Sequence, residues 1–245
     1  MESAQPHGGD SMILYIVRHG EPIYGPDILT ELGQKQAQAL VRRFEKSGLD
    51  RIFSSPMGRA RETAQPTADA LGLPVKIEPW MREIWPELAP IMPNGKRSFV
   101  IDLPADELRS PENRGYYEDW YNMPAMERID GKQVMARVVR HSDDFLRRLG
   151  YRRMEDGIYQ AEKPNDEHVA VFCHAGFGIT WLTHLLNIPP QLVWSAFYMT
   201  HTGVTVLNFV PNPSGLVTPR CLCWSDMSHL LESGLPYSYN NTLPV

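Results

Sequence analysis

Two short segments place chemically reactive side chains directly after apolar runs. Arg18 and His19 follow the run 12–17, and His174 follows the run 168–173. The β-branched and aromatic residues of these runs favour buried strands. Because the carboxyl ends of parallel strands open on one edge of a sheet, where ligands bind, we expect the three side chains to lie close together.

An arginine beside two imidazoles predicts a site for a doubly charged anion such as a phosphate group. The arginine fork suits phosphate or carboxylate. Ser55 and Pro56 are expected to open a helix, with Arg59 about one turn in. The backbone N–H groups of the helix after His174 are expected to be free for the same anion. The sequence shows no carboxylate cluster for a metal ion, so we expect the site to work without one.

A neutral imidazole can attack phosphorus, which predicts phosphoryl transfer to His19. Arg18 and Arg59 would neutralise the phosphoryl oxygens in the transition state. A leaving alkoxide also needs an acid. Glu83 lies beside apolar residues just after a predicted strand, and partial burial would raise its pKa. From the residues alone, three other carboxylates compete for this role: Glu21, Glu78 and Glu87.

The segments around these residues alternate between strand and helix. This alternation predicts an α/β fold: a three-layer sandwich with a mostly parallel central sheet and helices on both faces. The expected strands are 12–17, 51–54, 75–77, 168–173, and a pair at 204–210 and 216–223, with a hairpin at Asp156–Gly157. The expected helices are 30–46, 56–71 with a kink or break at Pro66, 130–149, and about 178–186, before an irregular tail after Trp224.

Residues 84–128 interrupt this alternation and predict an aromatic-rich cap inserted into a single domain spanning 12–245. Prolines recur there without a period, and residues 115–121 hold its densest aromatic cluster. Three interpretations stay open: a loop packed by its own aromatics, a lid that sets substrate choice, or a homodimer contact. Residues 1–11 are polar, lack the apolar core of a signal peptide, and are expected to form a disordered tail.

Composition and charge argue against several classes of protein. The net charge is −5, which disfavours a nucleic-acid partner. No run approaches the roughly 18 apolar residues of a membrane span. Cys173, Cys221 and Cys223 do not form a disulfide framework, so we expect reduced thiols in a cytoplasmic protein.

Four segments in the range 12–186 resemble, in order, the motifs of the histidine phosphatase (phosphoglycerate mutase-like) superfamily. They are 14–21 with Arg18-His19-Gly20, 29–37 with Leu-Thr-Glu-Leu-Gly, 54–64 with Ser-Ser-Pro and Arg59-Ala60, and 171–176 with Cys173-His174-Ala175-Gly176. The resemblance implies that His19 is the phosphorylated nucleophile. It implies that Arg18, Arg59 and His174 hold the phosphoryl group, with His174 protonated. Glu83 resembles the family's proton donor, which later activates water, and no cofactor is implied.

The resemblance also bears on the type of reaction. The family's mutases follow Arg-His-Gly-Glu with a serine, tryptophan and asparagine pattern and carry a later Arg-His-Tyr-Gly. This chain has Pro22-Ile23-Tyr24-Gly25 instead and lacks the later motif. This departure favours the phosphatase branch: a metal-independent phosphomonoester hydrolase acting through phosphohistidine on a small phosphorylated metabolite. A cofactor-dependent phosphoglycerate mutase and a non-catalytic module that binds a phosphorylated ligand remain alternatives.

The remaining histidines divide into one candidate for the site and several structural residues. His201 precedes a predicted strand and is a candidate for the pocket rim. His141, His184 and His229 are expected at the surface or at helix caps.

Overall fold

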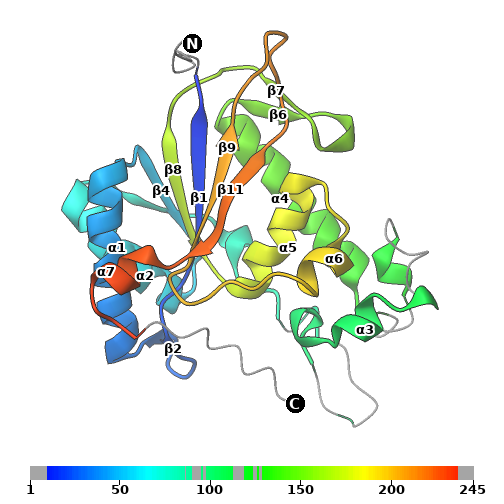
Figure 1. The fold of residues 1–245 in the computed structure, drawn as a ribbon, viewed down its shortest axis with the longest axis horizontal. Helices are drawn as coiled ribbons and strands as arrows, with labels where there is room; N and C mark the ends of the chain where they lie inside the picture. The colour runs from blue at the N-terminus through cyan, green and yellow to red at the C-terminus, as the bar shows by residue number, and fades with distance from the viewer. Residues whose placement is uncertain are drawn as a thin grey trace, which may run out of the picture.

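The computed structural model describes residues 10–85, 87–89, 95, 98–112, 119–123, 126 and 129–236. The tail expected over residues 1–11 lies almost entirely outside this part of the chain. A six-stranded sheet forms the centre of the fold (Figure 1). Its order is β11-β9-β1-β8-β4-β5, with β1 (Met12–Arg18), β4 (Arg51–Ser54), β5 (Val75–Ile77), β8 (His168–Cys173), β9 (Val204–Phe209) and β11 (Arg220–Asp226).

The strands β1, β8, β4 and β5 are parallel, whereas β9 and β11 run antiparallel to their neighbours. In the pairing of β1 with β8, Arg18 lies opposite Cys173. His19 and His174 therefore leave the sheet at the same level and from adjacent strands. The sequence prediction that these two histidines share one edge of a mostly parallel sheet is confirmed.

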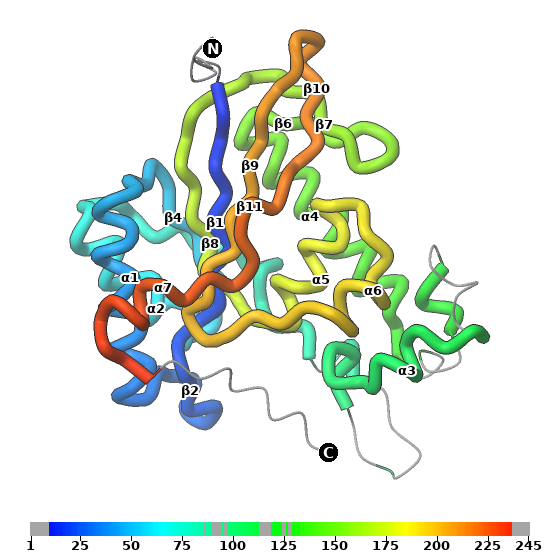
Figure 2. Tube along the Cα trace, in the orientation of Figure 1, coloured from blue at the N-terminus to red at the C-terminus, as the bar shows by residue number. Residues whose placement is uncertain are grey.

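Helices cover both faces of the sheet (Figures 1 and 2). Alternate residues of β1 enter separate clusters: Leu14 and Ile16 in one, Tyr15 and Val17 in the other. The three-layer prediction is therefore confirmed. One face carries α1 (Glu31–Ser47), α2 (Gly58–Leu71) and α7 (Ser228–Glu232), and the other carries α4 (Gly131–Arg148), α5 (Ala175–Leu186) and α6 (Pro190–Trp194).

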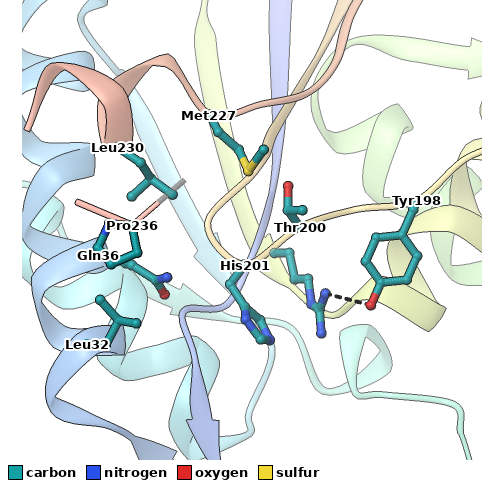
Figure 3. A pocket seen from close by; sticks show the side chains of 9 residues that line it. Leu32, Gln36, Tyr198, Thr200, His201, Met227, Leu230 and Pro236 are labelled. Atoms are coloured by element: carbon teal, nitrogen blue, oxygen red, sulfur yellow. Dashed lines mark hydrogen bonds between the residues drawn. The ribbon is translucent and has the colours of Figure 1, made fainter. Parts of the chain in front are cut away.

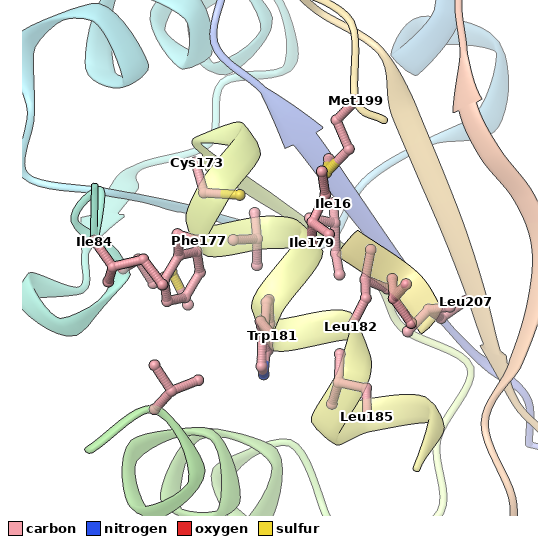
Figure 4. Close-up of a cluster of buried hydrophobic side chains, with 14 of the residues drawn as sticks. Ile16, Ile84, Cys173, Phe177, Ile179, Trp181, Leu182, Leu185, Met199 and Leu207 are labelled. Carbon is pink, nitrogen blue, oxygen red and sulfur yellow. The ribbon is translucent and has the colours of Figure 1, made fainter. Parts of the chain in front are cut away.

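The two long helices begin where their capping residues predict. Thr30 accepts a hydrogen bond from the backbone N–H of Gly33, and Asp130 accepts one from that of Gln133. Helix α5 is different because its residues 175–185 are all buried. Figure 4 shows Ile179 and Leu182 of α5 on the side toward Ile16 of β1 and Leu207 of β9, whereas Trp181 points away from them. This packing fixes the start of α5 next to the carboxyl ends of the parallel strands.

Several predicted boundaries were wrong. Helix α2 begins at Gly58 rather than at Pro56 and continues unbroken through Pro66, because its buried face packs into the core. Helix α5 begins three residues earlier than expected, which makes His174 its N-cap. Pro190 begins α6, and the chain after Trp224 continues β11 and then forms α7.

The predicted strand 216–223 is split around Pro219, which has no N–H to donate to a sheet. Its first part, β10 (Leu216–Val217), pairs with β7 (Tyr159–Ala161), and its second part is β11. Strand β7 also pairs with β6 (Tyr151–Arg153), so the predicted hairpin is confirmed. Its connection contains the short 3₁₀ helix η6 (Glu155–Gly157), where Asp156 and Gly157 have positive φ.

The described part of the 84–128 insertion is packed into the main core. It contains η2 (Val100–Asp102), α3 (Ala105–Leu108) and η4 (Trp120–Asn122). The Trp120 ring meets the Trp194 ring of α6 edge to face, with 4.9 Å between their centres. Within the aromatic stretch 115–121, residues 115–118 lie outside the described residues. The buried insertion residues in this core are Ile84, Leu88, Phe99, Val100, Leu103, Leu108, Trp120, Met123 and Met126.

Candidate active site

His19 lies directly after β1 and is 2% exposed. Its backbone N–H donates to the Cys173 carbonyl of β8, at 2.9 Å. Its ring nitrogen Nδ1 lies 2.7 Å from the carbonyl oxygen of Gly20. Because a carbonyl only accepts, this contact assigns the proton to Nδ1 and leaves the lone pair of Nε2 free. The geometry therefore suits Nε2 as a nucleophile.

The pKa values of both imidazoles favour the neutral form. Burial, followed by the charge of Arg18, lowers the pKa of His19 well below its usual value, which agrees with a nucleophilic role. Burial and the charges of Arg59 and Arg18 lower the pKa of His174 in the same way. This direction opposes the protonated state that the resemblance implies for His174, which stays a prediction. Its ring lies 5.2 Å from that of His19, and its Nε2 is 2.7 Å from the Ser55 hydroxyl.

The two predicted arginines are buried and held by different partners. Arg18 donates to the Met199 carbonyl at 2.6 Å and to the Tyr198 hydroxyl at 3.3 Å. Arg59, in the first turn of α2, is paired with Asp27 at 2.5 Å. The second oxygen of Asp27 accepts from the N–H of Gly58, at 2.7 Å. Asp27 thus caps α2 and fixes Arg59 with one carboxylate.

Sequence reasoning missed Asp27. It sits in the loop between β2 (Pro22–Ile23) and β3 (Ile28–Leu29), a short antiparallel pair. An acid in a loop rich in proline and glycine gives no specific signal, because turns commonly contain aspartate. Tyr24, from the same loop, places its ring 5.2 Å from the Arg59 guanidinium, within the range of a cation–π contact.

Glu83 follows the 3₁₀ helix η1 (Pro79–Met81) and accepts three backbone hydrogen bonds. Its Oε1 accepts from Phe177 and from Ile84, both at 2.9 Å, and its Oε2 accepts from Gly176 at 3.2 Å. Burial raises the pKa of Glu83, although these bonds and the charge of Arg18 oppose the change. The predicted shift is therefore confirmed.

The start of α5 does not offer the free N–H groups that the sequence analysis expected. Those of Gly176 and Phe177 bind the Glu83 carboxylate instead. The dipole of α5 therefore acts on the candidate proton donor, because a helix N-terminus stabilises a nearby negative charge. A phosphate group at this edge would therefore be held by side chains rather than by these two N–H groups.

Gly176 leaves the space that Glu83 occupies. A Cβ atom at this position would overlap the Phe99 ring and one oxygen of the Glu83 carboxylate. We expect Gly176→Ala to displace Glu83 and to lower kcat about tenfold or more for esters with poor leaving groups. Steady-state kinetics checks this. Gly178→Ala is the matched control, since its Cβ would mainly meet the flexible side chain of Met199, and an equal loss in both variants would contradict the prediction.

Four of the five predicted site residues line one cavity of about 800 Å³. The fifth, His174, lies beneath it against His19 and is fully buried. The competing acids Glu21, Glu78 and Glu87 instead hydrogen-bond Thr30, Trp80 and Arg82, respectively. The cavity lining comprises Arg18, His19, Tyr24, Pro56, Met57, Arg59, Arg82, Glu83 and Trp85.

Four of the six buried side-chain nitrogens without hydrogen-bond partners among the described residues belong to Arg18, Arg59, His174 and His201, around His19. They are Nε of each arginine, Nδ1 of His174 and Nε2 of His201; the other two belong to Arg137 and His229. An unpaired buried polar group costs about 1–3 kcal/mol, so a set of them in one place indicates that a ligand completes it. The ligand should be rich in acceptor oxygens, because the two arginine nitrogens can only donate.

The other histidines have well-defined surroundings. The His201 ring lies 5.6 Å from that of His19, and His201 lines a small second cavity with Arg18 rather than the large one. His184, in the last turn of α5, pairs with Asp143 at 2.8 Å but is buried. His229 is also buried, so its expected surface position was wrong. His141 is partly exposed and stacks on Trp80.

Within the part of the chain that the structure describes, no three histidine, cysteine or acidic side chains gather in a way that could hold a metal ion. Over the same residues, no helix combines the length and the apolar character that crossing a membrane requires.

The fold and the site together define an α/β protein whose sheet edge carries a neutral histidine beside two buried arginines. In comparison with known proteins, residues 14–87 match the model of the histidine phosphatase superfamily (branch 1), and this segment includes Arg18, His19, Arg59 and Glu83. The matched segment is therefore similar to that superfamily, and it includes four of the five expected site residues.

Curated relatives match part of the chain. The proteins named "Probable phosphoglycerate mutase GpmB" of Yersinia pestis (strain Pestoides F) and of Yersinia pseudotuberculosis (serotype O:1b, strain IP 31758) are each 36% identical over 136 residues. This match covers 52% of the present chain and 58% of each relative, so it spans little more than half of their length.

Solved structures share the fold over most of the chain. The phosphoserine phosphatase of Entamoeba histolytica in complex with 3-phosphoglyceric acid is 22% identical, with a TM-score of 0.59, over 89% of this chain and 99% of that one. The mycobacterial glucosyl-3-phosphoglycerate phosphatase in complex with inorganic phosphate is 22% identical, with a TM-score of 0.58, over 89% and 98%. At this level of identity, the likeness supports the architecture alone.

Proposed function

We propose that the protein is a metal-independent phosphomonoester hydrolase that forms a phosphohistidine intermediate on His19. The observation that carries the proposal is the free Nε2 of a neutral His19 at the end of β1, facing a cavity that Arg18 and Arg59 also line. A neutral imidazole is a competent nucleophile toward phosphorus. The two guanidinium groups balance the charge of the three phosphoryl oxygens in the transition state.

In the first step, Nε2 of His19 attacks phosphorus, and the bond between phosphorus and the ester oxygen breaks. Glu83 gives its proton to the departing alkoxide, a role favoured by its raised pKa. In the second step, the Glu83 carboxylate takes a proton from water, whose oxygen attacks the phosphorus of phosphohistidine, and the bond between phosphorus and Nε2 of His19 breaks with its electron pair returning to Nε2. Inorganic phosphate then leaves, and both His19 and Glu83 return to their starting states.

The shape and lining of the cavity favour a small organic phosphate as the substrate. Its volume of about 800 Å³ falls within the range of cavities that bind small molecules. Trp85, at the start of the insertion, lines it and is 43% exposed. The insertion therefore contributes to the subsite for the alcohol part of the substrate. A cytoplasmic location and the absence of a nucleic-acid partner remain part of this proposal.

A phosphoglycerate mutase is the second candidate, and the name of the curated relatives favours it. In a mutase, phosphohistidine would pass its phosphoryl group to a second phosphoglycerate rather than to water. Isomerisation of 3-phosphoglycerate that depends on 2,3-bisphosphoglycerate would identify this activity. A non-catalytic module would instead bind phosphate tightly without turnover.

A panel of phosphomonoesters assayed with a metal chelator tests the proposal. We expect turnover of several esters at kcat values of about 1–10³ s⁻¹, unchanged by the chelator. Release of inorganic phosphate and isomerisation of 3-phosphoglycerate should be measured on the same samples. Loss of all turnover in the chelator, restored by a divalent metal, would contradict metal independence. Isomerisation without net phosphate release would favour the mutase.

A further inference from the structure

A tight turn formed by residues 200–203, called here the 200–203 turn, is bound to the end of β1. The N–H of Gly203 donates to the carbonyl of Thr200 at 2.9 Å, which closes the turn. The N–H of Thr202 lies 3.1 Å from the Arg18 carbonyl and 3.3 Å from the His19 carbonyl. In the other direction, the N–H of Arg18 donates to the carbonyl of Gly203. The backbone of the proposed nucleophile is thus joined directly to this turn.

The turn contains a strained residue. Thr202 has φ of 55°, in the left-handed region that a β-branched residue rarely adopts. Such a conformation costs about 1–3 kcal/mol and persists only where the surroundings enforce it. The strained conformation of Thr202, close to the proposed nucleophile, indicates that it holds a neighbouring side chain in place.

Two elements far along the chain enforce this conformation. The Thr202 hydroxyl is 3.0 Å from Nε2 of His229, a buried residue of α7. From β11, the Ser225 hydroxyl accepts the N–H of Thr200 at 2.8 Å and also hydrogen-bonds its side chain. The 200–203 turn is therefore rigid, and its second residue, His201, has a defined position.

The position of His201 is beside His19 and Arg18. Its ring centre lies 5.6 Å from that of His19, only 0.4 Å farther than the ring of His174, which lies 5.2 Å from it. Its Nε2 is buried and has no hydrogen-bond partner in the described chain. With Arg18 it also lines a small second cavity of about 20 Å³, seen in Figure 3 together with Thr200 and Tyr198.

We propose that His201 is a third imidazole of the active site and donates a hydrogen bond from Nε2 to an oxygen of the phosphoryl group at His19. The inference rests on the proposed function only in that phosphate binds beside His19. Residues 198–236 lie outside the region that matches the family, so that match assigns no role to His201. The strained turn is explained by the same role, because it places this ring at the nucleophile.

The contribution of His201 is a directed hydrogen bond rather than a charge. Burial, with the charge of Arg18, lowers the pKa of His201 to about 3, so the ring is neutral at ordinary assay pH. A neutral imidazole has one N–H donor, and the phosphoryl oxygen supplies the acceptor that the buried Nε2 lacks. With 5.6 Å between the ring centres, His201 is near enough to His19 for its Nε2 to reach an oxygen of a phosphoryl group there at a normal hydrogen-bond distance of about 2.8 Å.

Binding of inorganic phosphate to His201→Ala and His201→Gln, measured by isothermal titration calorimetry, tests the proposal. We expect His201→Ala to weaken phosphate binding about tenfold. His201→Gln should recover most of this loss, because its amide nitrogen can replace Nε2 as donor. His141→Ala, a partly exposed imidazole outside both cavity linings, is the matched control and should bind like the unmodified protein.

Thermal unfolding of each variant separates a binding role from a structural one. Unchanged phosphate affinity in His201→Ala would overturn the proposal. Equal losses of affinity in both His201 variants, accompanied by equal drops in Tm, would also overturn it, since the ring would then only support the turn. If the unmodified protein binds phosphate but hydrolyses no ester, the proposed function fails while the test of His201 still stands.

Discussion

Replacing His19 by alanine is expected to lower the hydrolysis of p-nitrophenyl phosphate by at least about 10³-fold, because removal of a covalent nucleophile leaves only the binding groups of the site. The same variant should form no acid-labile phosphoenzyme. Because the His19 ring is buried, thermal unfolding of the variant should be measured as well, so that loss of activity is not mistaken for loss of the fold. The measurement is turnover together with trapping of radioactive phosphate on the protein in acid and in alkali.

His141→Ala is the matched control for this experiment, since it removes an imidazole that lines neither cavity. Phosphohistidine is labile in acid and stable in alkali, which distinguishes it from phosphoserine on Ser55. If His19→Ala turned over substrate as fast as the unmodified protein, covalent catalysis at this residue would be wrong. The site would then have to activate water directly.

Replacing Glu83 by glutamine is expected to slow the hydrolysis of alkyl phosphates by about 10²–10⁴-fold, the usual contribution of a general acid. The loss for p-nitrophenyl phosphate should be much smaller, because its leaving group needs no proton. The substitution also removes one acceptor from the N–H groups of Gly176 and Phe177, so thermal unfolding should accompany the kinetics. Equal slowing of both substrates would argue against proton donation.

The pH dependence of the unmodified protein follows from the same two residues. The pKa of His19 is lowered, so the nucleophile stays neutral down to pH values well below 6.5. Burial raises the pKa of Glu83 above its usual 4.5, so the acid form persists above pH 4.5 and is lost as the pH rises through the raised pKa. We therefore expect kcat for alkyl phosphates to be highest on the acidic side of neutrality, and the decline at high pH to disappear in Glu83→Gln.

Local patterns were sufficient to predict the sheet edge and the residues that lie on it. Arg18, His19 and His174 each follow an apolar run, and the rule that parallel strands open on one edge placed them together. Glu83 was harder to identify, since its neighbours in sequence do not show that it binds the start of α5. The resemblance to the family singled it out, and the structure gives the physical reason for its raised pKa.

Features that depend on distant contacts could not be predicted in this way. Asp27 fixes Arg59 only because the β2–β3 loop folds back onto α2. His201 reaches His19 because β9 pairs antiparallel to β1, and sequence periodicity does not reveal which strands become neighbours. The lowered pKa of His174 depends on its burial and on the charges of Arg59 and Arg18, which come from other segments of the chain. No single segment of the sequence reveals this combination.

The irregular edge strand β11 bears on whether two copies of this protein can associate through their sheet edges. Its pairing with β9 shifts register twice, between Cys221 and Cys223 and again between Cys223 and Asp226. Such bulges bend a strand and break the regular row of backbone groups that another strand would need. Leu222 on this edge is 60% exposed, but the bulges disfavour extension of the sheet by a second strand there. The same irregularity that brings Ser225 to the 200–203 turn is therefore also expected to disfavour aggregation through this sheet edge.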